Sequence, residues 1–229
     1  MLIAIEGVDK SGKETQSALL FSHLEHDGRN TRKIEFPDYK SEAAGAVRMY
    51  LGGRFGNRPD DVNPYAASTF FAVDRYASYK TDWGEFYNSG GVVVADRYTM
   101  SNMIHQGAKF SDESERRRFI DWLIDLEFVK IGLPAPDLVV FLDLPMDLRA
   151  KLINRHAVSA STAVAQPFRP GADIHERDLE YLNRSHVCAR EIAERLGWTR
   201  INVERDGSLR PALEIHDEIY ARVASFFTV

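Results

Sequence analysis

A glycine-rich loop near the start of the chain limits the folds that the chain can adopt. Residues 2–5 form a short apolar run, which predicts a buried strand, and the pattern Gly7-x-x-x-x-Gly12-Lys13 follows it. An apolar-periodic segment comes next and predicts a helix. Strand, glycine loop and helix in this order are the context in which the pattern forms a phosphate-binding loop, the P-loop. The alternative, a strand–turn–helix with chance glycines, is disfavoured by that context.

The residue types of this loop suit the binding of an anion. Gly7 and Gly12 let the backbone approach phosphate oxygens in conformations that a Cβ atom would forbid. The loop N–H groups and the N-terminus of the following helix then face the anion. Lys13 adds a positive charge beside the outer phosphates. We therefore expect a nucleotide site here.

Glu14 departs from the motif, because the residue after the loop lysine is ordinarily Ser or Thr, whose hydroxyl reaches Mg²⁺. The carboxylate could turn outward on the first helical turn, where the helix dipole favours a negative charge. It could instead join the shell of the metal, directly or through a water. We favour the metal placement, because Lys10 and Lys13 can balance the added charge. Thr15 is then free for a phosphate oxygen.

Composition limits the partners and the compartment. The chain has 229 residues, enough for one α/β domain, and a net charge of −5, which makes a nucleic-acid polymer an unsuitable partner. Its single cysteine, Cys188, fits a reducing compartment. No apolar run reaches the length of a membrane span. Because the first strand begins at residue 2, we expect no targeting segment, no membrane partner and a cytoplasmic location.

Strand and helix patterns alternate along the chain. The predicted strands cover residues 2–5, 31–36, 92–95, 138–142 and 200–203. The predicted helices after the first cover residues 43–51, 64–87, 112–129, 146–155, 176–196 and 213–226, and residues 157–172 read as a mobile loop. Apolar strands separated by helices predict a parallel sheet with helices on both faces. We see no internal repeat and expect a single domain over residues 1–229.

Several polar residues fall at the carboxyl ends of predicted strands, where such sheets bind ligands. Asp96 ends an apolar strand, where P-loop proteins place an acidic partner of Mg²⁺. A turn-forming, helix-capping aspartate is the alternative for Asp96. Arg97 follows it, and its planar bidentate donor suits a phosphate, although a surface ion pair is an equal alternative.

A long predicted helix carries a second pair of candidates. Phe71 and Arg75 are four residues apart and share a helix face. An aromatic ring beside a guanidinium could stack on a nucleobase and donate to its carbonyl. Periodicity alone would place Phe71 in the core instead.

Taken together, these residues resemble the thymidylate kinase family of P-loop nucleoside monophosphate kinases, in sequence order and over nearly the whole chain. The matching segments are Glu6-Gly7-Val8-Asp9-Lys10-Ser11-Gly12-Lys13, Phe36-Pro37-Asp38, Phe71-x-x-x-Arg75, Asp96-Arg97-Tyr98-x-x-Ser101-x-x-x-x-Gln106, and Gly132-Leu133-Pro134-x-Pro136-Asp137-Leu138 before Phe141-Leu142-Asp143. Each segment alone would be a weak signal, but together they are specific.

The resemblance implies a fold, a reaction and partners. The fold would be a doubly wound α/β domain around a five-stranded parallel sheet, with a lid around residues 155–177. The reaction would be the phosphorylation of dTMP to dTDP by ATP with Mg²⁺, as in dTTP synthesis. The family usually forms homodimers.

The resemblance also implies roles for individual residues. Asp9 would hold the sugar 3′-hydroxyl, Arg97 would bind the acceptor phosphate, and Tyr181 would lie under the deoxyribose. The implied dTMP-binding residues are Asp9, Phe36, Phe71, Arg75, Arg97, Ser101, Gln106 and Tyr181. The implied ATP-binding residues are Gly7, Val8, Asp9, Lys10, Ser11, Gly12, Lys13, Glu14 and Thr15. The implied catalytic cations are Lys13, Lys10, Arg97 and Arg169, and the metal ligands are Asp96 and Glu14.

The chain also differs from the family pattern. Many members have an arginine shortly after Phe-Pro, where this chain has Asp38-Tyr39-Lys40. The family divides by whether its catalytic arginine lies in the P-loop or the lid; here the P-loop has Lys10, and the lid region has Arg155, Arg169 and Arg177. Two other functions stay open: a kinase of another deoxynucleoside monophosphate, and a non-catalytic P-loop protein, which Glu14 favours.

Overall fold

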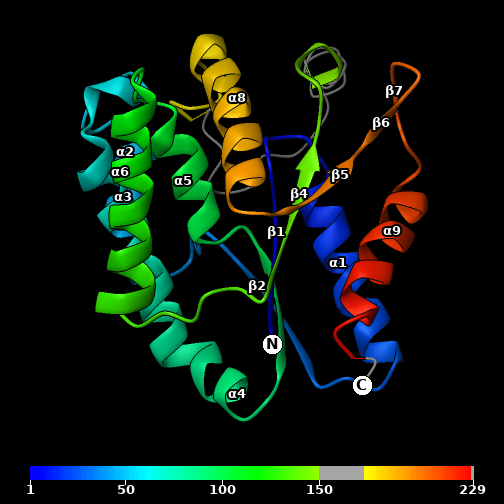
Figure 1. Ribbon diagram of the computed structural model, residues 1–229. Helices are drawn as coiled ribbons and strands as arrows, with labels where there is room; N and C mark the ends of the chain where they lie inside the picture. The colour runs from blue at the N-terminus through cyan, green and yellow to red at the C-terminus, as the bar shows by residue number, and fades with distance from the viewer. Residues whose placement is uncertain (150–172, 228–229) are drawn as a thin grey trace, which may run out of the picture.

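The computed structural model describes residues 1–149 and 173–227, which form a parallel sheet between two layers of helices (Figure 1). The strands are β1 (Leu2–Gly7), β2 (Thr31–Glu35), β3 (Val92–Asp96), β4 (Leu138–Asp143) and β5 (Thr199–Asn202). They lie in the order β2-β3-β1-β4-β5, and every neighbouring pair is parallel. The predicted five-stranded, doubly wound sheet is therefore confirmed.

The alternation of side chains along the strands divides the core between the two helix layers. The helices are α1 (Lys13–His26), α2 (Gly45–Leu51), α3 (Pro64–Ser78), α4 (Gly84–Asn88), α5 (Thr99–Gly107), α6 (Glu113–Ile124), α8 (Leu179–Arg195) and α9 (Ala212–Ala224). Ile3 and Ile5 of β1 pack with apolar residues of α1 and α9. Leu2 and Ala4 point the other way and join a cluster with residues of α5, α6 and α8. Because β1 is buried on both faces, its sequence is apolar apart from Glu6.

Three features depart from the predicted elements. Residues 64–87 were expected to form one helix, but α3 and α4 are separated by a π-helical turn, η3 (Tyr79–Trp83). A second π-helical turn, η4 (Asp125–Lys130), continues α6 at its C-terminal end. At the other end, Asp112 caps α6, and its side chain accepts a hydrogen bond from Glu115 N at 2.8 Å. α8 begins at Leu179 rather than residue 176.

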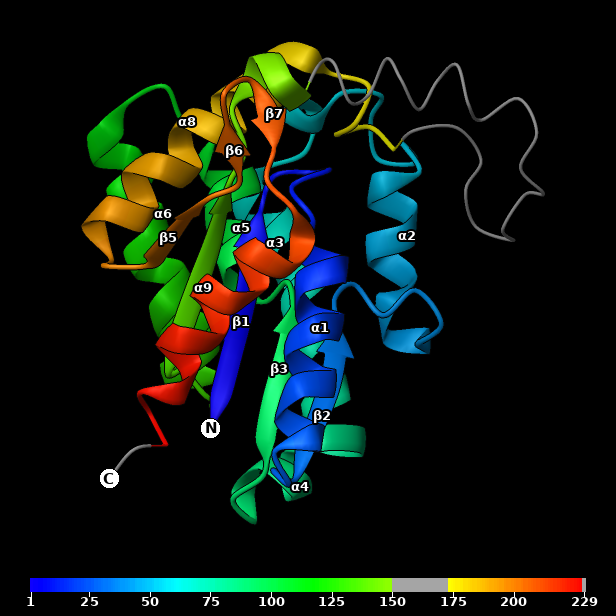
Figure 2. The ribbon, with the colours of Figure 1, turned by 90° about the vertical axis from the view of Figure 1, so that its right-hand side faces the viewer.

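Four short elements were not predicted as separate elements. A 3₁₀ turn, η1 (Glu42–Ala44), precedes α2, and another, η2 (Pro59–Asp61), precedes α3. Beyond β5, the strands β6 (Glu204–Arg205) and β7 (Ser208–Leu209) form a small hairpin near the start of α9 (Figure 2). The Asp206-Gly207 turn between them is a hairpin signal that the analysis of the sequence did not use.

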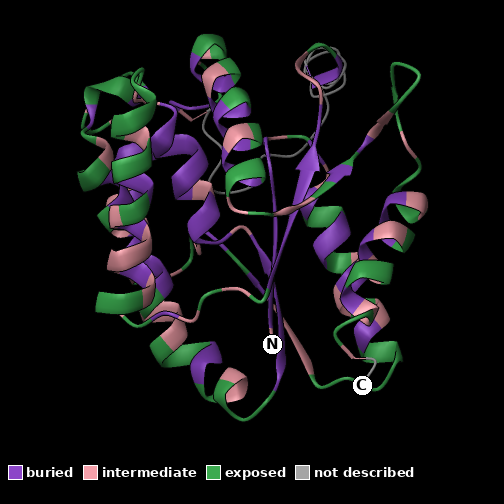
Figure 3. Ribbon diagram, in the orientation of Figure 1, coloured by how far each residue is buried: buried purple, intermediate pink, exposed green. Residues whose placement is uncertain are grey.

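The helix α5 was missed by the sequence analysis altogether, although it carries predicted site residues. All of its residues are buried except Ser101, which is half-buried (Figure 3). The helix is only nine residues long, and polar residues such as Thr99, Asn102 and Gln106 outnumber its apolar ones, so it gives a weak helical signal in the sequence. Within the described residues, no helix is long and apolar enough to cross a membrane.

Candidate active site

The P-loop lies between the carboxyl end of β1 and the start of α1, as the sequence predicts. Gly7 has a φ of +155°, and a Cβ atom there would lie 2.8 Å from the carbonyl oxygen of Leu142 on β4. Gly12, at the N-terminus of α1, has a φ of +93° in the left-handed region. Both glycines are therefore required by the backbone, one by close contact and one by conformation.

Lys13 is folded back onto the loop. Its ammonium group donates to the carbonyl oxygen of Val8 at 2.9 Å, and only 7% of the residue is exposed. Burial and the charge of Arg97 lower the pKa of Lys13 to about 8, against the opposing effect of nearby carboxylates. The lysine is thus held beside the loop, where a phosphate can replace the carbonyl as its partner.

The other polar P-loop positions differ in exposure. Lys10, Glu14 and Thr15 are exposed, whereas Ser11 is buried. Ser11 Oγ is shielded from solvent and has no hydrogen-bond partner in the described part of the chain. Glu14 lies on the first turn of α1, where its exposure favours the outward placement over the metal placement.

Asp96 ends β3 and is buried behind the P-loop, with 9% of its surface exposed. Its carboxylate lies 3.5 Å from the hydroxyl of Ser17 on α1. No cluster of three or more potential ligand side chains occurs within residues 1–149 and 173–227. Mg²⁺ in nucleotide sites commonly uses one or two carboxylates together with phosphates and waters, so this single buried carboxylate fits that ion.

Arg97 and Asp9 form an ion pair across the site. Arg97 follows β3 with a φ of +67°, a left-handed conformation that is strained for a residue with a Cβ atom. Burial opposes ionisation of Asp9, but the charges of Arg97 and Lys13 outweigh it and hold the pKa of Asp9 well below its usual range. The site is therefore charged before any ligand arrives.

Glu6 is a buried carboxylate next to the Asp9–Arg97 pair, and the sequence analysis assigned it no role. It is fully buried near the end of β1, where it accepts hydrogen bonds from Tyr98 N at 2.7 Å and from the Ser101 hydroxyl at 2.7 Å. Burial raises the pKa of Glu6, while Arg97 and these hydrogen bonds act in the opposite direction. A carboxylate in an otherwise apolar strand was the signal that could have identified it.

One pocket collects most of the predicted acceptor site. Its wall contains seven of the predicted residues, namely Asp9, Phe36, Phe71, Arg75, Arg97, Ser101 and Gln106. They come from the ends of β1, β2 and β3 and from α3 and α5. The wall also contains Tyr39, Asn102, His105, Asp173, His175 and Glu176, which the sequence analysis did not single out as site residues.

Arg75 is fixed by a buried acid that the sequence analysis assigned no role. Its Nε and Nη2 donate to the two carboxylate oxygens of Glu127 in η4, at 2.7 and 2.6 Å. Thr99 also donates to Glu127 at 2.7 Å. The guanidinium is 2% exposed and Glu127 is fully buried. This bidentate pair sets the plane of the guanidinium at the pocket wall.

Tyr181 does not lie on the pocket wall. It is fully buried, and its hydroxyl donates to the backbone carbonyl of His105 at 2.8 Å. Its ring packs 4.9 Å from the ring of His175. The geometry gives no support to the predicted contact between Tyr181 and the sugar, because His105 and His175 stand at the wall instead.

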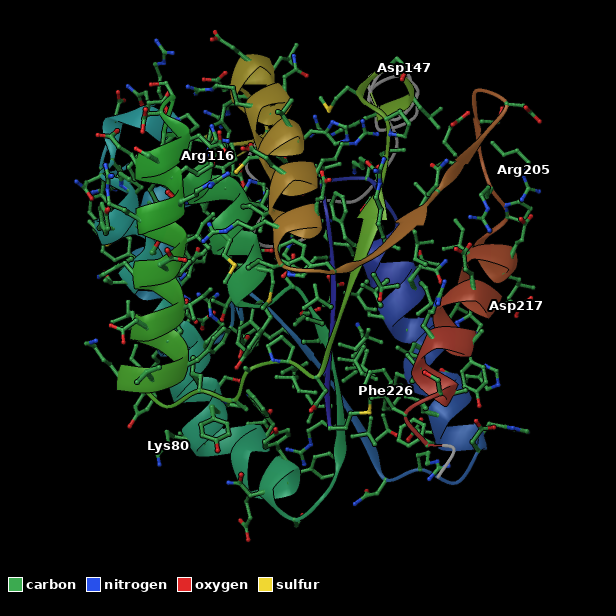
Figure 4. The ribbon with its side chains drawn as sticks, in the orientation of Figure 1. Lys80, Arg116, Asp147, Arg205, Asp217 and Phe226 are labelled. Carbon is green, nitrogen blue, oxygen red and sulfur yellow. The ribbon has the colours of Figure 1, made fainter. Side chains whose placement is uncertain are left out.

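Arg149 is a further cation beside the P-loop that sequence spacing did not reveal. It lies in the short helical segment after β4, is 2% exposed, and its Nε donates to the backbone carbonyl of Asp9 at 3.1 Å. Figure 4 shows Asp147, its near neighbour in the chain, above the carboxyl end of β4. Arg155 and Arg169, with most of the predicted lid, lie outside the described residues.

Comparison with known proteins agrees with the family resemblance seen in the sequence. The family model for thymidylate kinases matches residues 5–209. A thymidylate kinase from Mycobacterium tuberculosis is 34% identical over 199 residues, which cover 86% of this chain and 87% of that protein. The thymidylate kinase of Homo sapiens is 31% identical over 150 residues, or 66% of this chain and 64% of that protein.

A solved structure shares the fold. That of a thymidylate kinase from Candida albicans superposes with a TM-score of 0.67 and covers 98% of this chain and 91% of that chain. At 22% identity, this likeness concerns the fold alone.

Proposed function

Because the chain belongs to the thymidylate kinase family, we propose that it transfers the γ-phosphoryl group of ATP to dTMP and releases dTDP and ADP. The observation that carries this proposal is the pocket beside the P-loop, which has a base-binding end at Phe71 and Arg75 and a phosphate-binding end at Asp9 and Arg97. A nucleoside monophosphate spans these two ends.

The base-binding end favours a pyrimidine with a ring carbonyl. Phe71 is half-buried at the wall and offers a face for stacking. Arg75 uses two of its donor nitrogens on Glu127, and a guanidinium has further N–H groups that can donate to a carbonyl oxygen. Gln106 adds an amide whose buried Oε1 has no partner in the described part of the chain, so it can accept from a ring N–H.

The phosphate-binding end supplies charge and position for the transfer. Phosphoryl transfer is catalysed mainly by alignment and by neutralising charge. Arg97 binds the acceptor phosphate, Lys13 binds the donor phosphates, and the P-loop N–H groups enclose them. ATP-binding is assigned to the predicted loop residues 7–15.

Asp96 is the proposed protein ligand of Mg²⁺, directly or through water. The ion would neutralise charge on the donor phosphates. Glu14 was predicted as a second ligand; because it is exposed on the first turn of α1, we place it outward, away from the metal. The remaining catalytic cation is proposed to be Lys10 or Arg169, of which Arg169 lies outside the described residues.

The active form is proposed to be a cytoplasmic homodimer of this single domain. α3 and η4 are joined by the Arg75–Glu127 pair, and both expose apolar side chains. Val73 and Tyr76 of α3 are 56% and 42% exposed, and Val129 of η4 is 70% exposed. Covering this surface with a second copy would remove apolar area from water.

A dimer disrupted at this face tests that assembly. Val73→Glu places a charge in the proposed interface and should shift the particle from dimer to monomer in light scattering. Val187→Glu, a matched change at a 63% exposed site on α8, should leave the mass unchanged. A monomeric wild type would contradict the proposal.

A coupled ADP-release assay across dTMP, dUMP, dGMP, dCMP and AMP tests the reaction. We expect dTMP to be preferred and dUMP to be poor rather than inactive, because a lost methyl contact is worth only about 1–3 kcal/mol. Equal turnover of a purine monophosphate would assign another acceptor. ATP binding without any ADP release would indicate the non-catalytic alternative.

A further inference from the structure

The hydroxyl of Tyr50, on α2, lies at the centre of a buried polar chain behind the acceptor pocket. Lys109 Nζ lies 3.1 Å from this hydroxyl and 2.8 Å from the carbonyl oxygen of Val62. On the other side, the hydroxyl lies 2.7 Å from Nε2 of His175. Tyr50 is fully buried and His175 is 7% exposed, so water does not mediate these contacts.

The hydrogen bonds that join Lys109, Tyr50 and His175 fix which ring nitrogen of His175 carries the proton. A charged lysine has only donors, so Tyr50 must accept from Lys109. Gln106 Nε2 donates to the same hydroxyl at 3.5 Å, so both acceptor positions of the Tyr50 oxygen are used. The single proton of the Tyr50 hydroxyl is then left for His175, and Nε2 must accept it. Nε2 therefore carries no proton, and a neutral imidazole must carry its proton on Nδ1.

His175 is neutral because of where it lies. Burial and the neighbouring His105 and Lys109 lower the pKa of His175 well below its ordinary value. Nδ1 takes part in no hydrogen bond with residues of the described ranges, while the ring itself lines the pocket. His175 thus presents a donor N–H without a charge.

The position of His175 indicates which part of a nucleotide it meets. Its ring stacks on that of His105, with centroids 5.4 Å apart and 25° between planes. His105 feels the charges of Arg97 and Asp9 at the phosphate-binding end. Tyr50, on the other side of His175, packs edge-on against Phe71 of the base-binding end at 6.2 Å. The stacked pair therefore stands between base and phosphate, beside the sugar.

We propose that Lys109 and Tyr50 hold His175 in its Nδ1–H tautomer, so that it donates a hydrogen bond to a sugar oxygen of the bound nucleotide. This inference rests on the proposed function. His175 is then a binding residue, and Tyr50 and Lys109 are positioning residues that act through it, although Tyr50 also positions Gln106. Because a neutral N–H adds no charge attraction for phosphate, it favours binding of the uncharged sugar over binding of a phosphate group.

The tautomer can be read directly in the wild-type protein. Two-bond ¹H–¹⁵N correlation spectra of histidine-labelled protein distinguish a bare from a protonated ring nitrogen. We expect His175, assigned by its loss in His175→Gln, to show a bare Nε2 and a protonated Nδ1. A protonated Nε2 in the wild-type protein would overturn the proposal.

Kinetics then test the link to the substrate. In Tyr50→Phe, we expect the KM for dTMP to rise about tenfold, the effect of one lost neutral hydrogen bond, with kcat nearly unchanged. Lys109→Met should do the same to a smaller degree. Tyr79→Phe serves as the control, because among the described residues this hydroxyl pairs only with exposed Asn88.

Two replacements of His175 sharpen the assignment. Asn places an N–H where Nδ1 lies, whereas Gln places its amide where Nε2 lies. We expect His175→Asn to keep a lower KM for dTMP than His175→Gln. The reverse order, or an unchanged KM in Tyr50→Phe, would overturn the proposal. A wild type that fails to phosphorylate dTMP would instead overturn the proposed function.

Discussion

At the scale of single residues, the site consists of charged side chains that are largely buried and are paired or hydrogen-bonded with one another or with the backbone. Asp9 is paired with Arg97, Lys13 rests on a loop carbonyl, and Glu6 is held by hydrogen bonds from the start of α5. Glu14 differs from these, because it is exposed and projects from the first turn of α1. The P-loop region thus contains charged side chains that are held by other residues and one, Glu14, that is exposed to solvent.

Replacement of Glu14 tests its role at the metal. If the carboxylate points outward, Glu14→Ala should need the same Mg²⁺ concentration for half-maximal rate as wild type, and its exposure leads us to expect this result. A ligand role would raise that concentration, and Glu14→Ser would then recover much of the loss. The KM for dTMP should stay nearly constant in either case. The measurement is an Mg²⁺ titration of initial rate.

At the scale of elements, a buried ion pair joins α3 to η4 beneath the base-binding end of the pocket. Arg75 and Glu127 are both nearly inaccessible, so removing the charge of one leaves the other uncompensated. Thr99 ties the start of α5 to the same carboxylate. Three elements therefore depend on one acidic side chain.

Glu127→Gln should destabilise the fold by about 3 kcal/mol, because Arg75 keeps its charge in a buried place with a neutral partner. The KM for dTMP should rise as the guanidinium loses its fixed plane. Urea unfolding measures the first effect and initial rates the second. Glu113→Gln breaks an exposed pair with Arg117 on α6 and should cost less than about 1 kcal/mol. Equal costs in the two variants would contradict this account.

At the scale of the whole molecule, the described core contains histidines that titrate abnormally. Burial and nearby Arg97 lower the pKa of His105 to about 3. The unfolded chain binds a proton at this histidine near pH 6.5, so its contribution to stability is complete above that pH and is lost as the pH falls toward 3. Asp173 acts in the opposite sense, because burial raises its pKa to about 6.

A variant comparison isolates the histidine. Between pH 7.5 and pH 5, wild type should lose about 2 kcal/mol more unfolding free energy than His105→Gln, since the gap to the unfolded pKa is about 1.5 units. The charged groups that face His105 are Arg97, Asp9, Lys13 and Arg149. His26→Gln, at an 89% exposed site, should leave the pH dependence unchanged. Parallel curves for wild type and His105→Gln would refute the prediction.

The sequence predicted those parts of the molecule whose patterns are local. The apolar strands, the P-loop and the four-residue spacing of Phe71 and Arg75 are readable because neighbours in the chain carry the signal. The helix α5 was not predicted, since it is only nine residues long and polar residues outnumber its apolar ones. Its start at the end of β3 also places Ser101, His105 and Gln106 along one wall, which spacing alone does not reveal.

Hydrogen-bonded pairs of residues that are distant in the chain could not be predicted from the sequence either. Glu127 lies 52 residues from Arg75, and His175 lies 125 residues from Tyr50. Nothing in the local sequence links such pairs. The assignment of Tyr181 to the sugar lost its support for the same reason, because a tyrosine that buttresses His105 looks, in sequence, like one that touches a ligand.

The ion pair between Asp9 and Arg97 makes acceptor binding an exchange of anions. An arriving phosphate meets a guanidinium whose charge is already balanced, so it must share or displace the carboxylate. A nucleoside without a phosphate has nothing to exchange and leaves the pair intact. Once Arg97 turns to the phosphate, Asp9 loses the main charge that keeps it acidic. Binding therefore draws a fraction of a proton from the medium at acidic pH, and its measured heat depends on the buffer.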